Sequence, residues 1–181
     1  MNHSPINFKS ITMKITKGNE VNKDELNEFC VDVRKALENM TKKDHMWTSS
    51  FASSNFPMGC CGDTSRLLAY LLYQQFGIVP KLLSGIYYEF EHKLPASGLS
   101  NENSHAWLVV NGMIVDLTAD QFNDRGYYHP PVMITSDTSF HDFFANRNFS
   151  LQPSQSNTIT LPDELKMTAS HVQQKLKERG W

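Results

Sequence analysis

The strongest structural signal of the chain lies in residues 104–118, which read SHAWLVVNGMIVDLT. Two apolar runs, 105–110 and 113–118, flank the dipeptide Asn111-Gly112. Asn-Gly between apolar runs is typical of a two-residue β-hairpin turn, because both positions adopt positive φ easily. The stretch therefore predicts an antiparallel hairpin.

The register of this hairpin places two polar side chains together. With a two-residue turn, Trp107 opposes Asp116 and His105 opposes Thr118. Because side chains alternate along a strand, His105, Trp107 and Asp116 share one face, with His105 and Asp116 as diagonal neighbours. Burying an aspartate without a partner costs several kcal/mol. We therefore expect Asp116 to accept the imidazole N–H and to orient His105.

Before the hairpin, residues 59–63 read GCCGD at the start of a predicted helix, 61–76, which Gly77 ends. A helix N-terminus lowers the pKa of a thiol because its free N–H groups carry partial positive charge. On a helical wheel, Cys61 lies roughly 25° from the centre of the apolar stripe and Cys60 roughly 75° from it. Cys61 is thus the predicted nucleophile, with Cys60 as a cap or a wall of the site.

The remaining patterns predict one α+β domain over residues 1–181, with an antiparallel sheet between helices. A chain of 181 residues is too short for two ordinary domains. Asn22 followed by Glu25 predicts the start of a helix over 23–40. The other predicted segments are an edge strand in 6–15, a long loop over 41–59, a strand over 81–90, a polar loop over 91–103, a strand over 132–135, a short helix over 139–146 and a terminal helix over 162–177.

Composition excludes several classes of partner and cofactor. A net charge of −2 without a dense Lys/Arg stretch argues against nucleic acid and anionic membranes. The chain shows neither a signal peptide nor an apolar run of bilayer length, so we expect a cytoplasmic location. Three cysteines, two of them adjacent, do not suggest a disulfide framework, and the histidines lack metal-ligand spacing. We expect no metal and no cofactor, and the oligomeric state stays open.

Taken together, the motifs at 59–63, 104–107 and 115–118 resemble the core of the bacterial transglutaminase-like superfamily. The resemblance covers residues 56–122. It implies a papain-like fold in which a Cys-His-Asp triad forms a thioester with an acyl donor. Members of the superfamily include peptidases, amidases, deamidases, transglutaminases and inactive homologues.

The oxyanion of such a reaction needs hydrogen-bond donors, and the backbone N–H of Cys61 is one of them. Asn55 lies six residues before Cys61, the offset at which papain-like enzymes carry a glutamine, and is the candidate for the second donor. A turn-forming role is the alternative for Asn55. Trp107 and Gln121 are expected to border the site, with a core position and a turn as their respective alternatives.

The sequence therefore predicts an enzyme that transfers the acyl group of a protein or peptide amide through Cys61, His105 and Asp116. A catalytically inactive binding or regulatory module on the same scaffold is the alternative. A metal or redox site built on Cys60, Cys61 and His105 is disfavoured, because metal-binding cysteines usually stand two to four residues apart.

Overall fold

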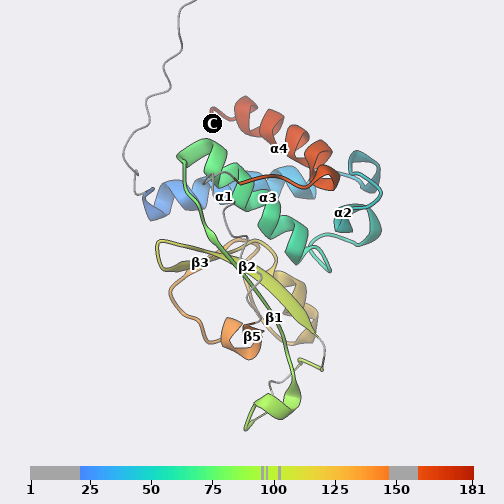
Figure 1. Cartoon of the computed structure of the whole chain (residues 1–181), viewed down its shortest axis with the longest axis vertical. Coiled ribbons are helices and arrows are strands. Elements are labelled where there is room, and N and C mark those ends of the chain that lie inside the picture. The colour runs from blue at the N-terminus through green and yellow to red at the C-terminus, as the bar shows by residue number, and fades with distance from the viewer. Residues whose placement is uncertain (1–20, 95, 97, 102, 147–158) are drawn as a thin grey trace, which may run out of the picture.

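The computed structural model describes residues 21–94, 96, 98–101, 103–146 and 159–181. It is an α+β fold in which α1, α3 and α4 form a layer beside an antiparallel sheet (Figure 1). The predicted strand in residues 6–15 lies outside the described residues. The helices are α1 (Lys23–Glu38), α2 (Ser50–Ser53), α3 (Cys61–Phe76) and α4 (Lys166–Glu178). The strands are β1 (Lys81–Ile86), β2 (Ser104–Val110), β3 (Met113–Asp116), β4 (Met133–Thr135) and β5 (Ala145–Asn146). The short 3₁₀ helices are η1 (Lys42–Asp44), η2 (Glu89–Glu91), η3 (Ala119–Arg125), η4 (His141–Phe143) and η5 (Asp163–Leu165).

The sheet has the strand order β4-β3-β2-β1-β5, and every neighbouring pair is antiparallel. At its centre, β2 and β3 form the predicted hairpin. Asn111 has a φ of 49° and Gly112 a φ of 78°, so both turn residues are left-handed. Val110 pairs with Met113, and this confirms the two-residue turn and its register.

Each face of the sheet carries its own apolar cluster. On one face, Leu108 and Val110 of β2 pack with the apolar stripe of α3, to which Leu67 and Leu68 belong. The opposite face carries Trp107 among aromatic and apolar residues of the loops. The members of this second cluster, called here the aromatic cluster, are Tyr87, Ala96, Leu99, Trp107, Ile114, Ala119, Phe122, Phe140 and Phe144. Alternation along β2 thus gives His105 and Trp107 to the aromatic cluster and Leu108 to the helices.

Both long N-terminal helices begin and end for local reasons. The Asn22 side chain accepts a hydrogen bond from the Glu25 backbone at 2.8 Å, which confirms the predicted cap of α1. Helix α3 has its predicted bounds, and Gly77 ends it with a left-handed φ of 67°.

Several predicted segments differ in the structure. The helix over 139–146 is wrong: only His141–Phe143 is helical, and Ala145–Asn146 pairs instead with β1. The edge of β1 offers backbone N–H and C=O groups with which this segment can pair. The local sequence pattern over 139–146 does not reveal such a long-range pairing. The strand predicted over 81–90 ends at Ile86, and the loop over 41–59 contains η1 and α2. The terminal helix begins as η5 before it continues as α4.

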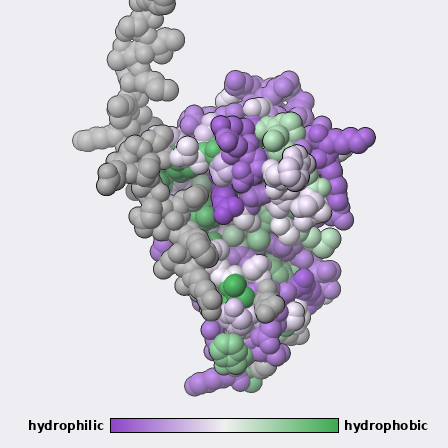
Figure 2. Space-filling view, turned by 45° about the vertical axis from the view of Figure 1, so that its right-hand side comes forward, coloured by the Kyte–Doolittle hydropathy of each residue, from purple (hydrophilic) through white to green (hydrophobic). Residues whose placement is uncertain are grey.

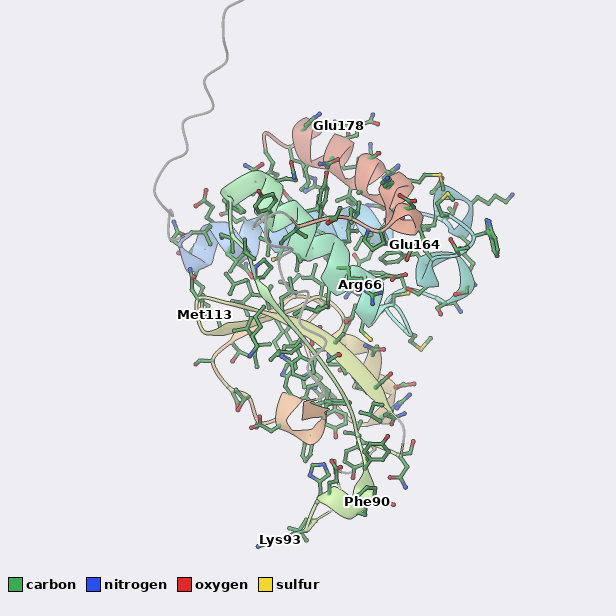
Figure 3. The ribbon with its side chains drawn as sticks, viewed as in Figure 1. Arg66, Phe90, Lys93, Met113, Glu164 and Glu178 are labelled. Carbon is green, nitrogen blue, oxygen red and sulfur yellow. The ribbon has the colours of Figure 1, made fainter. Side chains whose placement is uncertain are left out.

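Hydrophilic residues dominate the face drawn in Figure 2, where apolar residues form separate spots. Trp47, Phe90, Leu94 and Tyr128 are each at least 80% exposed. Phe90 lies near Lys93 at the tip of the segment that follows β1, far from α1, α3 and α4 (Figure 3). Within the described residues, none of the helices has the length and apolarity needed to cross a bilayer.

Candidate active site

The Asp116 carboxylate is the most heavily hydrogen-bonded group of the site. It is 2% exposed and lies at the end of β3. Its Oδ2 accepts hydrogen bonds from His105 Nε2 at 2.6 Å and from His141 Nε2 at 2.9 Å. Its Oδ1 accepts from the Thr118 backbone at 2.8 Å and from the Thr118 hydroxyl at 3.2 Å. Burial raises the pKa of this carboxyl, but the charge and hydrogen bond of His105 outweigh burial and hold the pKa well below its usual range.

His105 is held between this carboxylate and the aromatic cluster. The ring is 1% exposed, and it stacks on Trp107 at a centroid distance of 5.7 Å and meets Phe122 edge-on at 5.2 Å. Burial lowers the pKa of the imidazole, but the charge and hydrogen bond of Asp116 outweigh it and raise the pKa to about 10. The Asp116 carboxylate therefore stabilises the imidazolium form of His105.

Cys61 meets this imidazole from the first position of α3. The His105 side chain is the main group that interacts with this thiol, and the Ala106 backbone adds a smaller contribution. Helix α3 thus begins beside the start of β2, and the sulfur reaches the ring there although the helix packs on the other face of the sheet. Burial raises the pKa of the Cys61 thiol, but the hydrogen bond and charge of His105 outweigh it and hold the pKa below its usual value.

Cys60 stands at the N-cap position of α3, one of the two places expected for it, and its side chain is buried instead of forming a wall of the site. It is fully buried, whereas Cys61 is the more accessible of the two. Its sulfur points toward the carbonyl oxygens of Met58 at 3.4 Å and Ser50 at 3.7 Å. The helical wheel placed Cys61 nearer to the buried face than Cys60. This order is wrong because Cys60 precedes the helix, with a ψ of 2°, and so does not follow helical geometry. Burial raises the pKa of the Cys60 thiol to about 11.

The other predicted border residues fall in different places. Trp107 lies against the His105 ring, and Gln121 Nε2 lies 3.2 Å from His105 Nδ1. Asn55, in contrast, is exposed and lines a hollow of about 330 Å³ beside α1 and α2. Neither Cys61 nor His105 lines this hollow.

His141 is the site residue that the sequence analysis missed. It is 2% exposed, donates to Asp116 and lies 4.7 Å from Trp107 between ring centroids. Its Nδ1 is buried and has no hydrogen-bond partner among the described residues. His141 reaches the site because the chain after η4 pairs with β1 at Gly85, the residue that also pairs with His105. The only local signal was the density of phenylalanines around it.

A second missed residue is Arg34, which fixes the turn after β3 from the helical layer. Its guanidinium donates two hydrogen bonds to the Asp120 carboxylate, at 2.8 and 2.7 Å, and one to the Leu117 carbonyl at 2.6 Å. Asp120 lies next to Gln121 in the first turn of η3. A charged residue beside the apolar stripe of α1 was the signal that pointed to this role.

His105, Asp116 and His141 form the one group of possible metal ligands found in the described part of the chain. However, the Nε2 of His105 lies only 2.6 Å from Asp116 Oδ2. Two ligands of one tetrahedral zinc ion stand about 3.3 Å apart, given metal–ligand distances of about 2.0 Å. The cluster as it stands is therefore a hydrogen-bonded group, and an ion would have to push it open.

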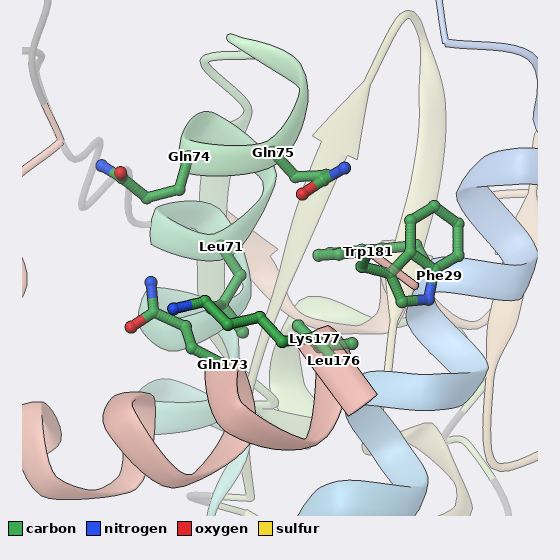
Figure 4. A pocket seen from close by; sticks show the side chains of 8 residues that line it. All are labelled: Phe29, Leu71, Gln74, Gln75, Gln173, Leu176, Lys177 and Trp181. Atoms are coloured by element: carbon green, nitrogen blue, oxygen red, sulfur yellow. The ribbon is translucent and has the colours of Figure 1, made fainter. Parts of the chain in front are cut away.

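A further hollow, of about 190 Å³, lies in the helical layer, where α3 and α4 face Phe29 and Trp181 (Figure 4). Gln74 and Gln75 come from α3 and Lys177 from α4. Its lining includes none of the groups around Cys61.

The fold and the site thus define an α+β protein in which a cysteine at the start of a helix interacts with a strand histidine that is hydrogen-bonded to a strand aspartate. Comparison of the chain with protein-family models, with curated proteins and with solved structures finds no match.

Proposed function

We propose that the protein is a cysteine-dependent acyl-transfer enzyme of the transglutaminase-like, papain-like kind, which acts on amide groups of proteins or peptides. The observation that carries the proposal is the row of three groups in which the Cys61 thiol interacts with His105 and His105 is hydrogen-bonded to Asp116 at 2.6 Å. Each contact favours the charge separation that makes the sulfur nucleophilic.

The roles follow from the proton positions. Asp116 accepts a hydrogen bond from the Nε2–H of His105, so Nδ1 is the nitrogen that takes the thiol proton. The thiolate of Cys61 then attacks the amide carbonyl and forms a thioester, while Nδ1 returns its proton to the leaving amine. Water or a second amine releases the acyl group from the sulfur.

The proposal is tested first by iodoacetamide labelling with peptide mass analysis near pH 7.5. Cys30 is fully buried, and burial raises its pKa to about 12, so it serves as the internal control. We expect Cys61 to be labelled at least about 100-fold faster than Cys30 in the native protein. In urea the two rates should become similar.

The greater exposure of Cys61 would by itself make its labelling faster than that of Cys30. The labelling rate of Cys61 in the unfolded chain therefore serves as a second reference. An activated thiol reacts faster in the native protein than the same thiol in urea, after correction for the effect of urea on the reagent. Native labelling of Cys61 that is no faster than this reference would contradict the proposal.

The acyl donor is identified by intact-mass analysis after incubation with candidate peptides. A mass increase that is lost in Cys61→Ala and reversed by hydroxylamine would mark a thioester. An inactive binding module would bind such peptides without the adduct, and its binding would survive Cys61→Ala.

A further inference from the structure

The Gln121 carboxamide bridges three groups around the proposed nucleophile. Its Oε1 accepts the Gly59 backbone N–H at 3.2 Å, and its Nε2 donates to the Thr118 carbonyl at 2.9 Å. The same Nε2 lies 3.2 Å from His105 Nδ1. Because the Gly59 N–H needs an acceptor and the Thr118 carbonyl needs a donor, only one orientation of the amide satisfies both.

This orientation leaves one amide hydrogen of Gln121 for the catalytic groups. The NH₂ group has two hydrogens, and one of them is taken by Thr118. The second is available to His105 Nδ1, the ring nitrogen that Asp116 does not occupy. Gly59 lies two residues before Cys61, so the amide stands between the chain that enters α3 and the imidazole.

Proton transfer changes the partner that this hydrogen needs. While His105 is neutral, the single lone pair of Nδ1 accepts either the Gln121 N–H or the Cys61 S–H, one at a time. Once Nδ1 takes the thiol proton it becomes a donor itself, and the Gln121 N–H loses its acceptor. The same step creates a negative charge, first on Cys61 sulfur and then on the carbonyl oxygen of the substrate, and this charge can accept the freed N–H.

We infer that Gln121 is the side-chain donor that stabilises the oxyanion formed when Cys61 attacks an amide carbonyl; the inference rests on the proposed function. In this step the S–C bond forms and the carbonyl π pair moves to oxygen, which accepts hydrogen bonds from Gln121 and from the Cys61 backbone. Collapse of the intermediate restores the carbonyl and breaks the C–N bond, and the Nδ1 proton leaves on the amine. This assignment replaces Asn55, which its position in the sequence had suggested as the oxyanion donor.

Two reactions of the same sulfur separate this role from a structural one. Acylation of Cys61 by p-nitrophenyl acetate passes through an oxyanion, whereas alkylation by iodoacetamide displaces iodide and forms none. We expect Gln121→Ala to slow acylation about 100-fold. Alkylation should stay unchanged or become faster, because the lost contact had favoured the neutral imidazole.

Two further variants control for packing and for the alternative donor. Gln121→Glu keeps an acceptor for the Gly59 N–H but removes the amide donor, so it should show the same selective loss of acylation. Asn55→Ala is the matched control, and it should acylate at the wild-type rate.

An equal loss of both reactions in Gln121→Ala and Gln121→Glu overturns the inference in favour of a structural role. Acylation within about threefold of wild type in these variants, or a loss in Asn55→Ala, overturns it as well. Failure of the proposed function looks different, because wild-type Cys61 would then show neither rapid alkylation nor acylation, and the inference would fall with it.

Discussion

Asp116 and His105 owe their unusual chemistry to the place where they are buried. A carboxylate out of contact with water is costly unless donors surround it, and Asp116 has four of them from three residues. One of these donors, His105, is the group that contacts the thiol. The aromatic cluster therefore does more than fill space, since it excludes the water that would weaken the interaction between carboxylate and imidazole.

The first prediction concerns the pH dependence of Cys61. In His105→Ala, the hydrogen bond and charge that lower the thiol pKa are lost, while the burial that raises it remains. The thiolate forms as pH rises, so the midpoint of the alkylation rate should move from below the ordinary thiol pKa in wild type to above it in the variant. Stopped-flow or mass-based rates between pH 5 and about 11 measure it.

His171→Ala on α4 is the matched control and should leave this midpoint in place. A midpoint that is the same in His105→Ala and wild type would show that His105 does not activate the sulfur. Amide cleavage, unlike alkylation, also needs the imidazolium as proton donor, so its rate should fall again as pH rises through about 10.

Among the structural elements, the β2–β3 hairpin carries the geometry of the site. Its two-residue turn sets the register in which the side chains of His105 and Asp116 share one face of the sheet. One inserted residue would turn one of these side chains to the face that packs on the helices. Helix α3 contributes its first residue only, because Cys61 acts from the end of the helix that meets the start of β2.

The second prediction tests this turn. Gly112 has a φ of 78°, and a Cβ added there would meet no atom within 4 Å, so a substitution changes backbone strain without a clash. Gly112→Ala should lower the free energy of unfolding in urea by about 1–2 kcal/mol.

Gly62 supplies the matched control, since it lies in α3 and its added Cβ also meets nothing within 4 Å. Gly62→Ala should leave stability unchanged or raise it by up to about 1 kcal/mol, because alanine favours a helix. Equal effects of the two substitutions would mean that the turn does not require a left-handed residue.

The whole molecule brings the site together from elements that are distant in the chain. Residues of α3, β2, β3, η3 and η4 converge on one point, and Arg34 of α1 holds η3 from the helical layer. This ion pair is largely buried, with side-chain exposures of 6% for Arg34 and 13% for Asp120. The helical layer is thus connected directly to the segment that carries Gln121.

The third prediction follows from the burial of this pair. Arg34→Ala leaves the Asp120 carboxylate without its partner and should lower the free energy of unfolding by about 3–5 kcal/mol. Arg34→Lys keeps the charge but not the two-pronged contact, so its loss should be smaller.

Lys175→Ala breaks an exposed ion pair on α4 and should cause no measurable change. A double-mutant cycle with Asp120→Ala isolates the coupling between the two side chains. Additive losses in that cycle would show that the contact contributes nothing of its own.

The sequence by itself determined the parts of the protein that depend on local chemistry. The Asn111-Gly112 turn, the cap at Asn22 and the end of α3 at Gly77 follow from backbone preferences of single residues. The shared face of His105 and Asp116 follows from the register of one hairpin, which is a short-range property of the chain.

The tertiary structure alone decided what depends on contacts between distant segments. His141 joins Asp116 because β5 pairs with β1, and Arg34 reaches Asp120 across the helical layer; neither contact leaves a periodic pattern in the sequence. Cys60 points into the core because it precedes α3, so a helical wheel does not predict the direction of its side chain. Local preferences fix φ, ψ and strand parity, whereas burial and side-chain partners depend on which segments the completed core brings together.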